Sequence, residues 1–320
     1  MDDNEVIFVT RGPKCFMYNG AGHNLKQYKS EEIRPRTLAR VGGDMMVGVC
    51  KKKPSLKSWI LGESKHKVQE DFTIPGHATA LAVSSCGQYC FVGIGKDLYV
   101  WKLTSGCLLS VIQQHYQDLS CIRVSADDDM VITGGKDGHV NVWLLVDLVQ
   151  ASDTSERRKT QFSWTNHSNE VTDIYNTPQG SCGRLATVSL DTTCRLYELN
   201  TGSLLTTVCL DVALSAVTMD TLECFIFCGD IFGELHCINI YEGLQREIHA
   251  NEPVNKKIKI HEQKIVNLEV NFDGSLLLTA SEDCIKVFML DSFSLMTRID
   301  EENCCGGITN AMFVSIPLRL

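Results

Sequence analysis

One phrase occurs three times in the 320-residue sequence. Residues 130–144 read MVITGGKDGHVNVWL, residues 185–199 read LATVSLDTTCRLYEL, and residues 276–290 read LLLTASEDCIKVFML. Each copy is a β-rich run, a small-residue stretch with an Asp, a tight turn, and a second β-rich run that carries an aromatic residue. Such repetition constrains the fold to an array of similar β units, because each unit must bury its apolar face against its neighbours.

The spacing of the units predicts a closed ring of blades. A period of about 40–45 residues is typical of WD-type β-propellers, and seven such units need about 300 residues. We therefore predict an all-β fold, a seven-bladed WD40 β-propeller formed as one domain by residues 1–316, with a short tail at 317–320. The units are expected at residues 5–30, 36–72, 77–112, 115–162, 167–208, 213–248 and 261–299.

The first unit is one strand short. Residues 5–30 hold only three strand candidates, whereas GGITNAMFVSI at 306–316 offers a spare one. Its pattern matches the first strand of other units, such as EVTDIYN at 170–176. We predict that this C-terminal strand pairs into the N-terminal blade and closes the ring, because closure removes sheet edges that would template aggregation.

Two segments interrupt the repeat and are predicted to be insertions on the rim. Residues 146–162 are expected to replace a clean fourth strand, since VDLVQ has helical spacing and DTSERRKT is polar with turn formers. Residues 249–260, HANEPVNKKIKI, are expected to form a long basic loop. Insertions in repeat proteins often bind partners. The candidate partner-binding residues are Val146, Leu148, Val149, Arg157, Arg158, Lys256 and Lys257.

A His, a Thr, an Asp and an aromatic residue recur together in three units. The sets are His115, Thr133, Asp137 and Trp143; His167, Thr187, Asp191 and Tyr197; and His261, Thr279, Asp283 and Phe288. The polar members resemble a hydrolase triad in composition, but a catalytic site need occur only once. A buried polar group without a partner costs about 1–3 kcal/mol, and in WD blades these positions satisfy one another. We predict three structural tetrads, with the networks of Tyr197 and Phe288 smaller than that of Trp143.

Composition and motifs argue against several other classes. A net charge of −9 opposes broad nucleic-acid binding, which needs many Lys and Arg. Asp follows Gly-Lys in GIGKD (93–97) and GGKDG (134–138), where a phosphate-binding loop needs Ser or Thr, and no Cys or His spacing fits zinc. No apolar run approaches the ~18 residues that span a bilayer. We therefore expect no enzymatic activity, no cofactor, no metal and no membrane association.

Cysteine usage and basic clusters complete the sequence evidence. The 15 Cys and an N-terminus without a signal peptide favour a reducing compartment, the nucleus or the cytosol. Local basic clusters are interpreted as solvated faces, with contact to an acidic protein or RNA phosphate as the alternative. These clusters are Arg34 and Arg36 with Lys51, Lys52, Lys53 and Lys57; Arg157, Arg158 and Lys159; and Lys256, Lys257, Lys259 and Lys264.

Three strings are more specific than a WD pattern requires. HYQDLSCIRVSADDDMVITGGKDGHVNVWLL (115–145), SLDTTCRLYELNTGSLLTTVCLDVALSAVTMD (189–220) and IFCGDIFGELHCI (226–238) resemble the WD-repeat subunit of the rixosome. The resemblance covers residues 75–312 and, less clearly, the first 70. Members of that family usually continue past the propeller into a C-terminal helical segment used for self-association. The given sequence stops at Leu320, just after the predicted closing strand, so self-association is not carried over to this chain.

The resemblance implies a non-catalytic scaffold subunit that acts in pre-60S ribosome maturation and in processing of the second internal transcribed spacer of pre-rRNA. It implies three protein partners: a PELP/Rix-type scaffold, a TEX/Ipi-type HEAT-like protein and the midasin AAA+ ATPase, with RNA contact at most indirect. The implied location is the nucleolus and nucleoplasm, with a cytoplasmic pool as an alternative. A WD40 adaptor of another complex, such as a ubiquitin-ligase substrate receptor or a chromatin or replication-licensing scaffold, is the rival interpretation.

Overall fold

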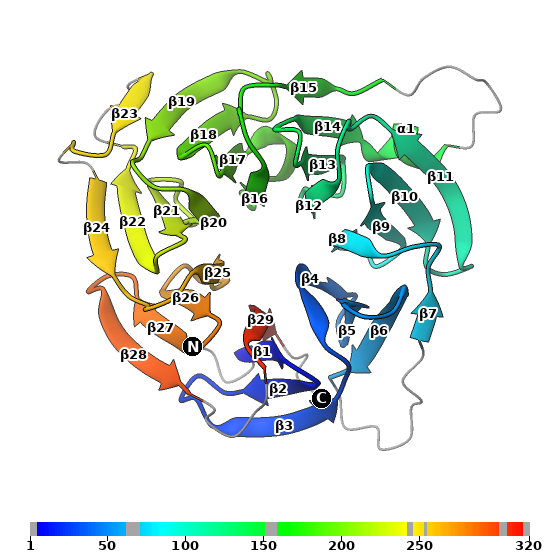
Figure 1. The fold of residues 1–320 in the computed structure, drawn as a ribbon, viewed down its shortest axis with the longest axis horizontal. Coiled ribbons are helices and arrows are strands. Elements are labelled where there is room, and N and C mark those ends of the chain that lie inside the picture. The colour runs from blue at the N-terminus through cyan, green and yellow to red at the C-terminus, as the bar shows by residue number, and fades with distance from the viewer. Residues whose placement is uncertain are drawn as a thin grey trace.

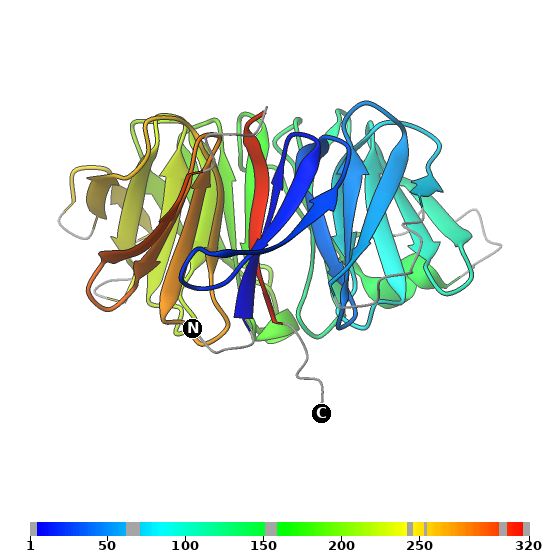
Figure 2. The ribbon, with the colours of Figure 1, turned by 90° about the horizontal axis from the view of Figure 1, so that it is seen from below.

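Seven β-sheets surround a central channel. The computed structural model describes residues 5–61, 71–150, 159–241, 246–252, 255–300 and 306–315. The sheets stand as blades around one axis (Figure 1), and the side view shows a short, wide ring of upright strands (Figure 2). This arrangement confirms the predicted all-β, seven-bladed propeller.

The four main strands of each blade are antiparallel to their neighbours, and one edge of each blade faces the channel. From the channel outward, the first three blades consist of β29 (Ile308–Ser315), β1 (Glu5–Arg11), β2 (Lys14–Tyr18) and β3 (Asn24–Lys29); β4 (Ile33–Val41), β5 (Met45–Cys50), β6 (Ser55–Ile60) and β7 (Asp71–Thr73); and β8 (Ala78–Val83), β9 (Tyr89–Ile94), β10 (Asp97–Lys102) and β11 (Cys107–Gln113). The next two consist of β12 (Leu119–Val124), β13 (Met130–Gly135), β14 (Val140–Leu144) and β15 (Phe162–Trp164); and β16 (Val171–Asn176), β17 (Arg184–Ser189), β18 (Thr193–Glu198) and β19 (Leu204–Cys209), with β23 (Glu247–His249) added outside. The last two consist of β20 (Leu214–Met219), β21 (Phe225–Asp230), β22 (Glu234–Asn239) and β24 (Asn255–Lys259); and β25 (Ile265–Val270), β26 (Leu276–Ser281), β27 (Ile285–Met289) and β28 (Ser294–Ile299).

Helical structure is sparse among the residues that the structure describes. One short α-helix, α1 (Leu145–Val149), follows β14, and a 3₁₀ turn at Gly180–Cys182 precedes β17. None of the helices in the described part of the chain has the length and apolar character needed to cross a membrane.

The hydrophobic core lies between adjacent blades. Ile132 and Val142 of one blade pack in one cluster with Ile174 and Leu185 of the next. Middle strands are accordingly buried on both faces, and β13 is buried along its whole length. The outer strand β11 instead alternates buried and exposed residues over part of its length, as a strand with one solvated face does. The blades therefore stabilise one another, and none has a complete core alone.

Hydroxyl groups join the innermost strands around the ring. Thr79 donates to the Leu119 carbonyl at 2.6 Å and Ser120 to the Val171 carbonyl at 2.5 Å. The same link continues with Thr172 to Leu214 at 2.9 Å and Ser215 to Ile265 at 2.7 Å. In each case the second residue of one inner strand reaches the first residue of the next. These side-chain bonds fix the spacing of the blades where no backbone ladder joins them.

The ring closes as the sequence predicts. Strand β29 pairs antiparallel with β1, in a register that runs from Glu5 opposite Ser315 to Arg11 opposite Ile308. Near one end of this pair, the Thr10 and Thr309 hydroxyls lie 2.7 Å apart. The N-terminal blade thereby acquires its fourth strand from the other end of the sequence.

The prediction of a long basic loop at 249–260 is wrong. Residues 255–259 form β24, the outer strand of its blade, paired with β22. Residues 247–249 form β23, which pairs in parallel with β19 of the neighbouring blade and buries Ile248. Lysines on an outer strand keep that edge solvated. The charge that indicated a loop is therefore the charge of an exposed edge strand.

The predicted insertion at 146–162 is correct only in part. Its first residues form α1, as the helical spacing indicates. The fourth strand is not replaced, however, because β15 follows the insertion and pairs with β14 through Phe162, Ser163 and Trp164. With only three residues, β15 is too short for a strand pattern to stand out in the sequence.

Hydrogen-bonded tetrads and candidate interaction surfaces

The complete tetrad lies in the blade of β12–β15. The Trp143 indole N–H donates to the Thr133 hydroxyl at 3.3 Å, and that hydroxyl lies 3.0 Å from His115 Nε2. The Asn141 amide also approaches Nε2, at 3.1 Å. Since Nε2 accepts from its neighbours, the ring proton sits on Nδ1 and is donated to Asp137 at 3.1 Å. The chain of bonds thus joins the turn before the blade to the aromatic residue of its third strand.

Hydrogen bonds also set the ionisation of Asp137. Burial by itself raises the pKa of Asp137, but bonds from His115 and from the N–H of Tyr116 outweigh burial and lower the pKa to about 2. The carboxylate is therefore ionised at neutral pH and serves as a fixed acceptor.

The blade of β16–β19 has the same arrangement without the aromatic link. His167 lies 3.0 Å from Asp191 and 2.9 Å from Thr187. The Tyr197 hydroxyl instead accepts a hydrogen bond from the Asn166 amide at 3.1 Å. The phenol hydroxyl of Tyr197 therefore does not join Thr187, but the Thr193 hydroxyl adds hydrogen bonds to His167 at 3.1 Å and to Asp191 at 2.7 Å.

The third set is incomplete, and Asp283 does not belong to it. His261 contacts Thr279 at 2.9 Å, but its other nitrogen faces the Cys284 sulfur at 3.4 Å, while Asp283 is exposed. The turn explains the difference: Thr133 pairs with the eighth residue after it, whereas Thr279 pairs with Lys286, the seventh. The shorter turn removes the position from which Asp reaches the ring.

Without a carboxylate beside it, the third histidine has a different pKa. Burial, followed by the charge of nearby Lys286, lowers the pKa of His261 to about 4. His261 is therefore neutral at physiological pH and held by Thr279 and Cys284. Phe288, which has no hydrogen-bonding group, packs instead in an apolar cluster with Ile265 and Leu277.

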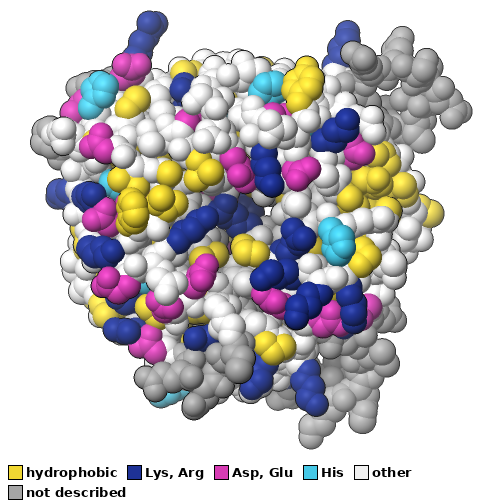
Figure 3. Space-filling model, in the orientation of Figure 1, with side chains coloured by type: hydrophobic (Ala, Val, Ile, Leu, Met, Phe, Trp, Pro, Cys, Tyr) yellow, Lys and Arg dark blue, Asp and Glu magenta, His cyan; other side chains and the backbone are white. Residues whose placement is uncertain are grey.

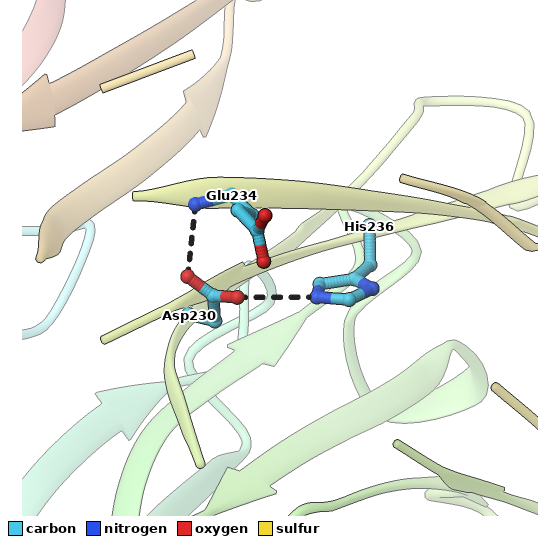
Figure 4. Close-up of side chains that lie close together, drawn as sticks. All are labelled: Asp230, Glu234 and His236. Carbon is cyan, nitrogen blue, oxygen red and sulfur yellow. Dashed lines mark hydrogen bonds and ion pairs between the residues drawn. The ribbon is translucent and has the colours of Figure 1, made fainter. Parts of the chain in front are cut away.

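The blade of β20, β21, β22 and β24 lacks the upstream His and has a different set of hydrogen bonds in its place. Figure 4 shows Asp230 receiving the backbone N–H of Glu234, at 2.8 Å, and facing His236, whose Nε2 lies 3.4 Å away. Asp230 and His236 are buried, and the Glu234 carboxylate forms an ion pair with Lys257 at 2.5 Å. Burial raises the pKa of Asp230, but the bonds from His236 and the backbone lower it overall.

Asp230, Glu234 and His236 also have the residue types of a metal site, with ligand atoms within 4.8 Å of one another. Protein groups already occupy both carboxylates, so the cluster acts here as an internal support for the turn. The sequence interpretation missed it because the Asp of this turn precedes its Gly by three residues, whereas Asp137 directly precedes Gly138.

The candidate residues of α1 separate into exposed and buried ones. Val146 is 50% exposed and Val149 is partly buried, whereas Leu148 is completely buried with Phe91 and Trp143. The Ser110 hydroxyl of β11 donates to the Leu148 carbonyl at 2.8 Å. The prediction that Leu148 faces a partner is therefore wrong, because the helix packs down onto the neighbouring blade.

The remaining candidates lie on the outer wall or outside the described residues. Lys256 and Lys257 are exposed on β24, and the Glu234 carboxylate raises the pKa of Lys257. Arg157 and Arg158 fall in residues 151–158, outside the described residues. A role in partner binding stays a prediction for these four.

Polar side chains also line the central channel. A cavity of about 220 Å³ is bordered by residues of the inner strands, among them Arg36, Arg123, Tyr175 and Glu269. Burial raises the pKa of Glu269 to about 8, against the lowering effects of the Phe313 N–H, which donates to it at 3.1 Å, and of Arg123. Glu269 is therefore largely protonated at neutral pH.

This protonation predicts a pH-dependent stability. Because the folded-state pKa lies above the ordinary value, the folded chain holds a proton that the unfolded chain has lost, and stability falls as pH rises from about 4 to about 8. The Glu269→Gln variant keeps an acceptor for the Phe313 N–H but cannot ionise. Urea unfolding at pH 5, 6.5 and 8.5 should show the wild type losing stability relative to the variant. Parallel curves would contradict the assignment.

The closed ring of blades and the tetrads define a protein of the WD-repeat β-propeller class. A family model of the WD domain, G-beta repeat, matches residues 106–143 and 158–198. WD repeat-containing protein 18 of Homo sapiens is 32% identical over 304 residues, covering 94% of this chain and 69% of that protein. The chain belongs to the family of WD repeat-containing protein 18, which confirms the family resemblance identified from the sequence.

Two further relatives carry a descriptive name. Pre-rRNA-processing protein pro-1 of Caenorhabditis elegans is 29% identical over 289 residues, covering 83% of this chain and 54% of that protein. Pre-rRNA-processing protein IPI3 of Yarrowia lipolytica is 26% identical over 294 residues, covering 87% of this chain and 67% of that protein.

Proposed function

We propose that this protein is a non-catalytic scaffold subunit of a complex that processes pre-rRNA during ribosome assembly. The observation that carries the proposal is the similarity, over most of the ring, to two relatives named as pre-rRNA-processing proteins. The structure is compatible with a scaffold, because the recurrent His, Thr and Asp side chains form internal hydrogen bonds that stabilise the blades.

An apolar strip on the rim is the surface that we assign to a protein partner. Leu108 and Val111 of β11 are 47% and 42% exposed, and α1, which packs on β11, adds the exposed Val146. Hydrophobic side chains gather over the β11 side of the ring in Figure 3. Exposed apolar side chains that lie together are typical of protein interaction sites.

A more specific proposal concerns the complex and the compartment in which the protein acts. We infer a rixosome-type complex that acts on pre-60S particles and on the second internal transcribed spacer, in the nucleolus and nucleoplasm. Its partners would be a PELP/Rix-type scaffold, a TEX/Ipi-type HEAT-like protein and the midasin AAA+ ATPase. The family membership and the names of the relatives support this setting.

Affinity purification with mass spectrometry tests the proposal, together with spacer-containing pre-rRNA measured after depletion. We expect pre-60S proteins in the purified material and accumulation of the uncut spacer. A partner set of ubiquitin-ligase or replication-licensing subunits, with unchanged spacer levels, would instead favour the rival adaptor role.

A matched pair of variants tests the rim surface. Leu108→Ser should reduce recovery of the partners, whereas Leu295→Ser, at a residue 50% exposed on the outer strand β28 of another blade, should not. Circular dichroism melts should be similar for both, because both side chains are half exposed. Equal recovery with the two variants would mean that the apolar strip is not the docking surface.

A further inference from the structure

The innermost strand of the second blade carries a bulge that contains two arginines, and one of them, Arg36, borders the channel cavity. Along β4, Ile33 pairs with Cys50 and Leu38 with Gly48, so residues 34–37 have no partners of their own in the ladder. Arg36 in this segment has a φ of +59°, in the left-handed region that a side chain with a Cβ rarely adopts. Bulges of this kind re-aim side chains and are frequent beside functional sites.

The bulge is held by neighbouring polar groups. The side-chain amide of Asn310, on the ring-closing strand, donates to the Arg34 carbonyl at 2.9 Å and accepts the N–H of Thr37 at 3.2 Å. The Thr37 hydroxyl also donates to the Arg34 carbonyl, at 2.8 Å. A strained residue costs about 1–3 kcal/mol and persists only where the surroundings enforce it. These hydrogen bonds hold the backbone of the bulge in the conformation that carries the two arginines.

The cations at this place lack anionic partners. Within the described ranges, Arg34, Arg36 and Lys264 form no ion pair, and Nε of both arginines is buried without a hydrogen bond. Other basic groups nearby are paired: Lys51 with Glu32 and Arg123 with Asp173.

Arg36 and Lys264 also interact electrostatically. Burial, followed by the charge of Arg36, lowers the pKa of Lys264, while Glu170 and Glu282 act in the opposite direction. Arg36 borders the channel cavity, and Lys and Arg side chains gather around the central opening in Figure 3. Positive charge therefore concentrates at one mouth of the channel, on a chain with a net charge of −9.

We propose that the bulge at Arg34–Arg36, with Lys264, is a binding site for a phosphate group at the mouth of the central channel. A phosphate group carries a charge of about −1.5 to −2 and three acceptor oxygens, which match two guanidinium groups and one ammonium group. A single carboxylate is satisfied by one guanidinium fork. The acidic body disfavours a long polyanion lying across it, so the site suits a compact phosphate compound or one phosphate of a short strand.

Titration calorimetry of the 320-residue chain with inorganic pyrophosphate tests the site. Arg36→Gly removes the cation and suits the positive φ, so this variant should fold with undiminished thermal stability. We expect its affinity for pyrophosphate to fall by about tenfold or more, as loss of a charged hydrogen bond predicts. Lys52→Gln, which removes an exposed charge in the turn after β5, should change the affinity less than about twofold, as a screened surface charge predicts.

Two further ligands identify the source of the phosphate. A five-nucleotide RNA that binds in an Arg36-dependent manner would show that a nucleic acid can supply it, whereas binding of pyrophosphate alone would point to a free phosphate compound. Failure of pyrophosphate to bind the wild type, or equal losses in the two variants, would overturn the proposal. Arg36-dependent binding of an oligo-aspartate peptide without pyrophosphate binding would overturn it in favour of an acidic protein. None of these outcomes depends on the role in pre-rRNA processing.

Discussion

Asp137→Ala should lower the free energy of unfolding by about 2–4 kcal/mol, and Asp283→Ala by less than about 0.5 kcal/mol. Asp137 accepts hydrogen bonds from the His115 ring and from the Tyr116 N–H, and its removal leaves the buried His115 ring without its carboxylate partner and the exposed Tyr116 N–H without its acceptor. Asp283 is exposed, and its side chain has no part in the third tetrad. Urea unfolding of the two variants at pH 7 measures the difference.

Asp137→Asn is the matched control. Its amide oxygen can still accept from His115, but the negative charge is gone, so we expect an intermediate loss of stability. Equal destabilisation by Asp137→Ala and Asp283→Ala would show that the tetrad contributes little to the fold.

Leu148→Ala should be the second large effect, with a loss of about 2–5 kcal/mol. The side chain is fully buried between α1 and the neighbouring blade, and deleting it leaves a cavity against Phe91 and Trp143. Val146→Ala, two residues earlier on the same helix and half exposed, should change the stability by less than about 0.5 kcal/mol. Thermal and urea unfolding of both variants give the comparison, and a stable Leu148→Ala protein would mean that α1 can leave the ring without cost.

The fold could be predicted because its signal is repeated. Seven copies of one strand pattern reinforce one another. Only one of the seven predicted blades lacks a strand, so the spare strand at 306–316 can be assigned to it. The errors arose at single positions where a local property has two physical meanings. Lys256 and Lys257 are compatible with a loop or with an exposed edge strand, and only the pairing with β22 decides between them.

The site residues show the same difference between features that repeat along the sequence and features that occur once. His115, Thr133 and Asp137 could be grouped because their order, with Asp four residues after Thr, repeats at His167, Thr187 and Asp191. Asp283 was grouped with them although it precedes its aromatic residue by five positions, whereas Asp137 precedes Trp143 by six. The shorter spacing was visible, but its consequence for the direction of the side chain depends on the turn geometry. The bulge at Arg36 leaves no such signal, because a positive φ at an arginine cannot be read from residue type.

The pairing of β29 with β1 also determines when the protein can finish folding. Ribosomes add about 5–20 residues per second, so the ~300 residues between the two strands take about 15–60 s to synthesise. During that interval β1, a strand with an apolar run at residues 6–9, has one unsatisfied edge. Such an edge is open to mispairing with other nascent chains. The ring is thus a fold in which the edge of the first strand stays open until the last strand has been made.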